Sequence, residues 1–319
     1  MEREYLRLYK HYSQVYGPNT CVFYMVGKFY EMYDAIDEET NEPKTSMKRA
    51  AELLNIQLSV KDNGSLFAGV PEQSLHKFAA VLTRNNWTVV VCDQVKDQSG
   101  KVIDRPTARI LSPGTHYEVV GADAPFVSAV WIQERDWQKK EPPAYGAAFF
   151  DLTTGITTGF QGEATGTADT WSADQLVQAI QIHNPKEIVV FWRGDLASMP
   201  KEQMLRTNFG GTQALLHLRL ANAHEQGGFE KEIVREDFLK RHYNPQTMLP
   251  ILDYLHLRDK ENLERAVIGL LRFMEDHLPS TLERLQAFQP WTPQGKVHMG
   301  NNALTQLNII SNRVEDSVL

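Results

Sequence analysis

Two short apolar segments on either side of a glycine constrain the fold of this chain most. Residues 21–26 (CVFYMV) carry no charge and predict a buried strand, and residues 29–33 predict a second short strand after a turn at Gly27. Around this pair the periodicity predicts helices at residues 2–16, 48–54 and 71–84, and strands at residues 66–68, 87–92 and 109–111. Together these patterns predict a mixed α/β unit at the N-terminal end of the chain.

The rest of the 319 residues is expected to form further domains. A polar, proline-containing segment near residues 139–143 marks a boundary. Strands then alternate with a helix, which favours an α/β sheet, and the last part is helical, with an amphipathic helix at residues 261–278. The expected fold class is α/β and α+β multidomain. The expected ranges are a first domain at 1–118, a linker at 119–143, a second domain at 144–228, and the beginning of a helical domain at 229–319.

Charge is unevenly distributed along the chain. The formal net charge of -7 argues against a strongly basic protein that binds nucleic acid without specificity. Residues 1–120 hold 14 Lys and Arg against 15 Asp and Glu, so the acidic excess belongs to the remainder. The N-terminal part is therefore the better place for a DNA-binding surface, because phosphate contacts normally supply most of the affinity for DNA.

Cysteine content and apolar runs exclude several classes of protein. Cys21 and Cys92 do not form a Cys-x-x-Cys pair, so the sequence suggests neither a zinc site nor a disulfide framework. No apolar run reaches the ~20 residues of a membrane helix, and the charged first residues do not resemble a secretory signal. A reducing, intracellular compartment is the simplest expectation.

The segment FYMVGKFYEMY at residues 23–33 is the most informative part of the sequence. It closely resembles the mismatch-reading motif of the MutS family, in which an aromatic-x-Glu triplet follows a glycine turn. Further blocks match the same family in order, at residues 50–56, 68–71, 89–94 and 112–115, with Arg105 and Arg109 before the last. Later blocks at residues 146–155, 184–188 and 299–308 are also similar. The residues of the last block resemble the corresponding segment of the branch found in large viruses and octocoral mitochondria.

The resemblance implies a mismatch-recognition domain, an RNase-H-like connector and the beginning of the helical lever and core. It also implies noncatalytic recognition of mismatched or looped duplex DNA. The implied partners are mismatched double-stranded DNA, a second MutS-like chain and downstream repair proteins, with no membrane. The family's ATPase follows the helical core, so we expect no enzyme activity and no cofactor here; ATP and Mg belong to full-length relatives. The sequence contains no phosphate loop of the G-x-x-x-x-G-K-S/T type.

Phe29 is the expected wedge of this motif. A flat apolar ring can enter between base pairs from the minor groove, at a cost that is least where pairing is already faulty. Glu31 lies two residues further on, so on a strand it points to the same side. The resemblance implies that Glu31 bonds the wedged base, which a protonated or charge-compensated carboxyl group could do. Our hypothesis is that Phe29 supplies most of the affinity and Glu31 the selectivity.

Four cations and the turn glycine complete the candidate DNA-binding residues. Gly27 forms the turn, and Lys28 follows it at a position where bacterial relatives commonly carry an acid. Lys61, Arg105 and Arg109 are further candidates for phosphate contacts, which position a protein without specifying sequence. For each of these three residues an ordinary solubilising charge explains the sequence at least as well.

Two alternatives to the mismatch sensor remain open. A metal-dependent nuclease could use Asp151 in the RNase-H-like domain, but it would need several converging carboxylates, and the sequence offers no convincing partners. We expect Asp151 to be structural, bonded to the turn at Thr153 and Thr154. The other alternative is an interaction scaffold that has lost DNA binding. It predicts a buried Phe29. The triplet taken alone, as an ordinary strand with an aromatic residue in the core, predicts the same.

Overall fold

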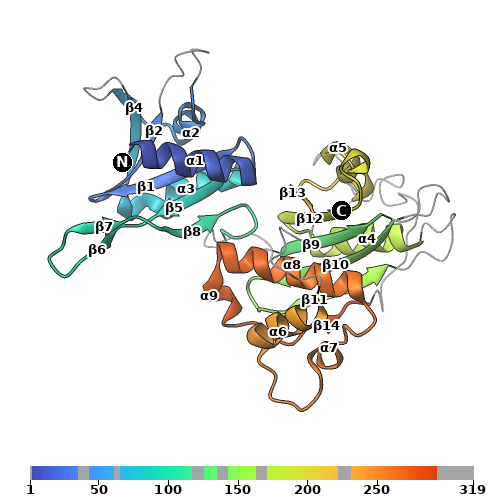
Figure 1. The fold of residues 1–319 in the computed structure, drawn as a ribbon. Coiled ribbons are helices and arrows are strands. Elements are labelled where there is room, and N and C mark those ends of the chain that lie inside the picture. The colour runs from blue at the N-terminus through green and yellow to red at the C-terminus, as the bar shows by residue number, and fades with distance from the viewer. Residues whose placement is uncertain are drawn as a thin grey trace. The chain divides into compact units, whose positions relative to one another are not determined.

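The computed structural model describes residues 2–34, 43–60, 65–116, 126–134, 143–162, 171–221 and 231–292. The chain is mixed α/β and divides into two compact units, the first built on residues 1–122 and the second on residues 123–275 with 279–319 (Figure 1). Among the helices of the described ranges, none combines the length and apolar character that crossing a bilayer requires.

The first unit is a six-stranded sheet in the order β3-β4-β2-β1-β5-β8. All neighbouring strands are antiparallel except β1 and β5, which run parallel. The strands are β1 (Thr20–Val26), β2 (Phe29–Asp34), β3 (Ser59–Val60), β4 (Leu66–Pro71), β5 (Thr88–Cys92) and β8 (Thr107–Leu111). The helices are α1 (Glu2–Tyr16), α2 (Met47–Leu54) and α3 (Leu75–Arg84), the last preceded by the short 3-10 helix η1 (Glu72–Ser74).

Helix α1 covers one face of this sheet, and α2 and α3 cover the other (Figure 1). The sequence explains the position of α1, because its tyrosines recur at helical spacing and form one apolar stripe. Tyr5 of this stripe is buried, and Tyr9, Tyr12 and Tyr16 pack against the same core. Strand β5 (TVVVC) is buried along its whole length, as expected for a central, β-branched strand.

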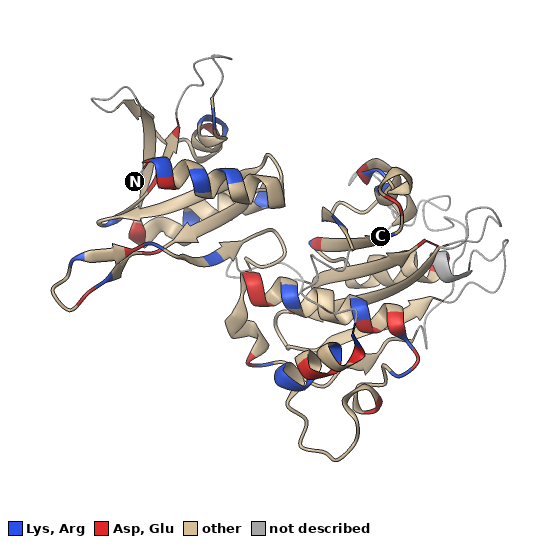
Figure 2. Ribbon diagram, in the orientation of Figure 1, with Lys and Arg blue, Asp and Glu red and all other residues tan. Residues whose placement is uncertain are grey.

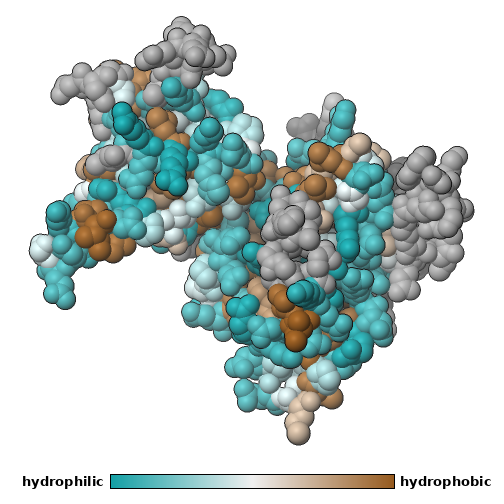
Figure 3. Space-filling view, in the orientation of Figure 1, coloured by the Kyte–Doolittle hydropathy of each residue, from teal (hydrophilic) through white to brown (hydrophobic). Residues whose placement is uncertain are grey.

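A two-stranded arm extends from the first unit (Figure 1). It consists of β6 (Val95–Lys96) and β7 (Val102–Asp104), which pair antiparallel. Asp97 closes the turn of the arm, because its Oδ1 accepts hydrogen bonds from the backbone N–H groups of Ser99 and Lys101, each at 2.9 Å. The arm carries an apolar surface (Figure 3), and the side chain of Ile103 is 63% exposed there.

The second unit is also built on a six-stranded sheet, in the order β13-β12-β9-β10-β11-β14. Its strands are β9 (Phe126–Gln133), β10 (Ala144–Asp151), β11 (Thr157–Gly162), β12 (Glu187–Arg193), β13 (Leu215–Leu220) and β14 (Gln289–Pro290). Its helices are α4 (Trp171–His183), α5 (Glu202–Asn208), α6 (Glu232–Tyr243), α7 (Ile251–Tyr254), α8 (Glu261–His277) and α9 (Pro279–Leu282), with a 3-10 turn η3 (Leu196–Ser198) before α5.

Strand β9 lies inside the segment that the sequence assigns to a linker, residues 119–143. It occupies a central position in the sheet, between β10 and β12, and six of its eight residues are buried. The proline-containing end of the segment suggested a linker, but the run FVSAVWIQ before it is apolar and rich in β-formers. A short, fully buried strand lacks the alternation that identifies a half-buried one, which is why it was missed.

Helix α8 packs closely on the sheet of the second unit. Gly146 and Gly159 leave room for its first turn: a Cβ at Gly146 would lie 2.3 Å from backbone atoms of Asn262, and one at Gly159 would lie 2.9 Å from the side chain of Leu263. The side-chain oxygen of Gln161 accepts hydrogen bonds from the N–H groups of Asn262 and Leu263, at 3.0 and 3.3 Å. These bonds satisfy two of the N–H groups that a helix start leaves unpaired. Helix and sheet therefore belong to one unit, although the expected domain boundary near residue 229 separates them.

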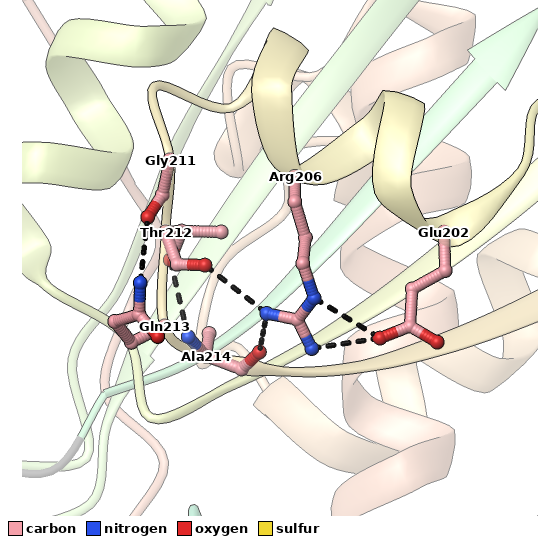
Figure 4. A network of polar contacts seen from close by, with 6 residues as sticks. All are labelled: Glu202, Arg206, Gly211, Thr212, Gln213 and Ala214. Atoms are coloured by element: carbon pink, nitrogen blue, oxygen red, sulfur yellow. Dashed lines mark hydrogen bonds and ion pairs between the residues drawn. The ribbon is translucent and has the colours of Figure 1, made fainter. Parts of the chain in front are cut away.

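One arginine fixes the connection between α5 and β13 (Figure 4). Arg206 donates from Nε and Nη2 to Oε1 of Glu202, at 3.0 and 2.7 Å. Its Nη1 donates to the backbone oxygens of Thr212 and Ala214, at 3.1 and 2.9 Å. One guanidinium group therefore joins helix α5 to the loop that enters β13 and restrains the backbone of this loop.

Candidate nucleic-acid interface

The candidate site begins with the tight turn between β1 and β2. Val26 pairs with Phe29, so only Gly27 and Lys28 form the loop. Gly27 has φ +63°, and Lys28 is not among the residues with positive φ, which is the pattern of a type II′ turn with glycine at its first central position. The backbone oxygen of Lys28 accepts a hydrogen bond from the N–H of Glu72 at 2.9 Å. The tip of the hairpin is thus attached to the end of β4.

Phe29 stands at this tip with half of its surface exposed, at 50%. The next residue, Tyr30, points to the opposite side of β2 and is buried. The strand neighbours of Phe29 are Val26 on β1 and Pro71 on β4, so apolar side chains flank the ring on both sides. The exposed face of such a ring is free to stack on a flat apolar surface.

Glu31 shares the face of Phe29, as the two-residue spacing predicts. Its direct neighbours are Tyr24 on β1 and Gly69 on β4. Gly69 has no side chain, so the carboxyl group is not covered from that strand, and Glu31 is half-buried. The hydroxyl group of Tyr33, two residues further along the same face, donates a hydrogen bond to Oε2 of Glu31.

A cluster of buried tyrosines under α1 supports this face. The ring of Tyr5 meets those of Tyr24 and Tyr33 edge to face, with centroids 6.3 and 5.2 Å apart. The hydroxyl of Tyr24 donates to Oε2 of Glu4 at 2.7 Å. Burial and then this hydrogen bond raise the pKa of Tyr24 to about 12. Tyr24 is therefore a neutral hydrogen-bond donor throughout the neutral pH range.

Arg105 lies on the same face and supports the hairpin. Its guanidinium carbon is 5.2 Å from the centre of the Tyr24 ring, a cation–π distance. Its Nε donates to the backbone oxygen of Met25 at 2.9 Å, and the side-chain amide of Gln94 donates to the same oxygen at 3.0 Å. The end of β1 is thus held from the base of the arm.

Arg109 lies on the opposite face of the sheet. It pairs with Val91, which pairs with Phe23, and these positions alternate with the face of Tyr24 and Glu31. Its Nη2 is 3.6 Å from Oδ2 of Asp93, whose Oδ1 accepts a 2.6 Å hydrogen bond from the Tyr30 hydroxyl. Burial and then the bond to Asp93 raise the pKa of Tyr30 to about 12.

Comparison with known proteins gives a family match for the unit that carries this hairpin. The family described as MutS domain I matches residues 1–120. A DNA mismatch repair protein mutS homolog of Acanthamoeba polyphaga mimivirus is 23% identical over 339 residues, which cover 95% of this chain and 29% of that protein. A DNA mismatch repair protein MutS of Prochlorococcus marinus is 25% identical over 317 residues, covering 92% and 30%. This chain is thus similar to MutS proteins over most of its length, and its residues 1–120 match MutS domain I. It spans less than a third of the length of these two relatives.

Of the residues expected for the MutS motif, the structure brings Gly27, Lys28, Phe29, Glu31 and Arg105 to one hairpin and one face. Lys28 is exposed in the turn. Arg109 is not brought to this face, and Lys61 lies outside the described residues. Sequence reasoning missed Tyr33 as a partner of Glu31. The two-residue spacing that places Glu31 beside Phe29 also places Tyr33 beside Glu31, so the signal was present.

Asp151, the acid considered for a nuclease, has the structural role that the sequence predicts. Its Oδ1 accepts hydrogen bonds from the N–H and hydroxyl of Thr153, at 2.8 and 2.6 Å, and its Oδ2 accepts one from the Thr154 hydroxyl at 2.9 Å. Within the described ranges of the chain, no group of three or more His, Cys, Asp or Glu side chains could hold a metal ion.

Proposed function

We propose that this chain is a MutS-family protein that recognises mismatched or looped duplex DNA, with Phe29 as the inserted wedge. One observation carries the proposal: half of the Phe29 surface is exposed at the tip of a supported hairpin, beside a carboxyl group on the same face. The hairpin lies within the residues that MutS domain I matches. The relatives named as DNA mismatch repair proteins support the same assignment.

The physics of insertion explains how such a hairpin can find a mispair without reading sequence. Unstacking a base step costs a few kcal/mol, and this cost is lowest where pairing is already defective. Stacking a base on an aromatic ring returns about 1–3 kcal/mol and does not require a particular base. A rigid hairpin that presents Phe29 therefore binds most tightly where the duplex deforms most easily.

Glu31 supplies selectivity in this proposal. Its carboxyl group, on the face of Phe29, would bond the base that the ring displaces. An ordinary phosphate environment disfavours a carboxylate, so its contribution depends on protonation or on compensation by nearby cations. Lys28 in the turn and Arg105 on the same face are the cations we assign to phosphate. Arg109 and Lys61 remain predictions as phosphate contacts, and the pairing of Arg109 with Asp93 gives that arginine a structural task as well.

We further propose that the chain is the sensor part of a mismatch-repair ATPase. In that assembly the ATPase module, with ATP and Mg, would belong to full-length relatives, and the protein partners would be a second MutS-like chain and downstream repair proteins. The chain itself would bind DNA without chemistry. A nuclease centred on Asp151 is not favoured, because both carboxylate oxygens already accept hydrogen bonds from the adjoining turn.

The test is a comparison of equilibrium binding to G·T and G·C duplexes of the same sequence at fixed salt. We expect tighter binding of the G·T duplex, and Phe29→Ala should weaken that binding by about 5- to 150-fold, the loss of one stacked ring. Ile103→Ala is the matched control, because it truncates another exposed apolar side chain of the same unit. Equal affinity of the parent for both duplexes, or an unchanged Phe29→Ala, would refute the proposal.

A further inference from the structure

Helix α1 carries a row of three cations, Arg3, Arg7 and Lys10, which we call the basic row (Figure 2). All three side chains are exposed. Their spacing of four and then three residues places them on one side of the helix. At about 100° per residue this side is directly opposite the buried Tyr5, so the row points away from the sheet. It extends over about 10 Å of helix, at 1.5 Å per residue.

The acids of the same helix do not neutralise this row. Glu4 accepts the hydrogen bond from the Tyr24 hydroxyl, and Glu2 accepts one from the hydroxyl of Ser65 at 3.0 Å. Both carboxylates are thus engaged by the body of the unit. Among the described residues, no ion pair or side-chain hydrogen bond is found for the three cations of the row. The outer side of α1 is therefore locally positive in a segment, residues 1–120, whose charges nearly cancel.

The basic row also lies on the side of the unit that carries the hairpin residues Phe29 and Glu31. Helix α1 covers the face that presents Phe29 and Glu31, because its Tyr5 contacts Tyr24 and Tyr33 on that face. Helices α2 and α3 cover the opposite face (Figure 1), so their cations lie on that side of the sheet. A duplex that meets the hairpin from the Phe29 side would therefore pass α1 and not α2 or α3.

We propose that the basic row is a second DNA contact, which binds the phosphate backbone beside the inserted hairpin. This inference rests on the proposed function for its geometry. It adds positive charge where the candidate site has little: of the candidate cations, the described part of the hairpin face carries Lys28 and Arg105, and Arg105 also holds the end of β1. Duplex DNA carries one charge per about 1.7 Å of its axis, so a row of this length faces several phosphates. Such contacts raise affinity for every duplex and do not distinguish a mismatch.

The test measures how binding depends on salt. The full chain with Arg3→Gln, Arg7→Gln and Lys10→Gln is compared with the parent on G·T and G·C duplexes over a series of KCl concentrations. Glutamine keeps a similar helix propensity, so α1 is preserved. Each lost phosphate contact lowers the slope of log affinity against log salt by about 0.9. We expect a slope smaller by about two to three, an equal loss of affinity for both duplexes and an unchanged ratio between them.

A matched control removes the same charge from the other face. Lys48 on α2 and Lys77 and Arg84 on α3 are all exposed, and their combined replacement by glutamine changes the net charge equally. This control should change the slope by less than one. Equal slopes for both triple variants, or no change with the α1 variant, would overturn the inference.

The same titration separates this inference from the proposed function. A parent that binds both duplexes equally, but loses its salt slope in the α1 variant, supports the basic row and refutes mismatch recognition. A parent that prefers G·T, with an α1 variant of unchanged slope, does the reverse. If the parent binds neither duplex at low salt, both are refuted.

Discussion

The hydroxyl group of Tyr33 donates a hydrogen bond to the carboxyl group of Glu31, from two residues further along the same face of β2. Tyr33 is almost fully buried, with 1% of its surface exposed, and its ring packs edge to face against Tyr5. Burial and then the bond to Glu31 hold the pKa of Tyr33 well above its usual range, so the phenol stays a donor. A fixed, neutral donor thus restrains the carboxyl group that is proposed to contact the displaced base.

Tyr33→Phe should reduce mismatch selectivity without weakening binding to ordinary duplex DNA. The substitution keeps the packed ring and removes only the hydrogen bond, which is worth about 0.5–1.5 kcal/mol. We expect the ratio of G·T to G·C affinity to fall by about two- to tenfold while G·C affinity stays constant. In a Glu31→Ala background the same change should have no further effect.

Tyr24→Phe is the control for this effect. It removes an equivalent tyrosine–carboxylate bond on the same face, but the Tyr24 hydroxyl donates to Glu4, at 2.7 Å, and not to Glu31. If Tyr24→Phe lowered the affinity ratio as much as Tyr33→Phe, the effect would be a general loosening of the domain and not a restraint on Glu31.

Arg105 should show two separable effects, one of charge and one of shape. Arg105→Ala removes a proposed phosphate contact, so the salt slope of DNA binding should fall by about one for both duplexes. It also removes the bond to Met25, which should lower the free energy of unfolding by about 1 kcal/mol. Arg105→Lys keeps the charge but not the planar geometry, so it should keep the slope and still lose stability, as measured by urea denaturation. A lysine variant with parental stability would contradict the structural role.

The local part of the site was accessible from sequence because it depends on short-range rules. A glycine between two strands places the turn, and the two-residue period of a strand places Glu31 on the side of Phe29. The amphipathic helix expected at residues 261–278 is observed as Glu261–His277. The mixed α/β character of the chain also followed from the alternation of patterns. In each case the residues that decide the outcome are neighbours in the sequence.

The parts that sequence did not supply depend on pairing between distant strands. Arg109 is predicted as a phosphate contact beside the site, but its pairing with Val91, which pairs with Phe23, places it on the other face of the sheet. The support of Met25 by Arg105 joins residues 80 positions apart. Strand β9 takes its place because β10 and β12 pair with both of its edges. None of these relationships leaves a periodic signal in the residues themselves.

Gly146→Ala should strongly destabilise the second unit. A Cβ there would lie 2.3 Å from the backbone of Asn262 and Leu263, so α8 would have to move off the sheet. Overpacking of this kind costs about 1–3 kcal/mol, and we expect the upper end because backbone atoms are involved. Hydrogen exchange should show lost protection in β10 and α8. Gly69→Ala, whose nearest contact would be an ordinary 3.5 Å from the Tyr30 oxygen, should leave stability almost unchanged.

Asp151→Asn should destabilise the second unit at neutral pH but not in acid. Partial burial acts to raise the pKa of Asp151, but the hydrogen bonds from Thr153 and Thr154 outweigh it and lower the pKa below its ordinary value. A carboxyl group whose pKa is lower in the folded state stabilises the fold above its unfolded pKa, near 3.9, and loses this contribution as the pH falls through the folded value. The difference in unfolding free energy between parent and variant should therefore be about 1 kcal/mol at pH 7 and close progressively below about pH 4. Asp195→Asn removes the same charge from an exposed turn and should give no such gap at pH 7. A gap for Asp151→Asn that stays constant from pH 7 to pH 3 would mean that its ionised carboxylate does not stabilise the turn.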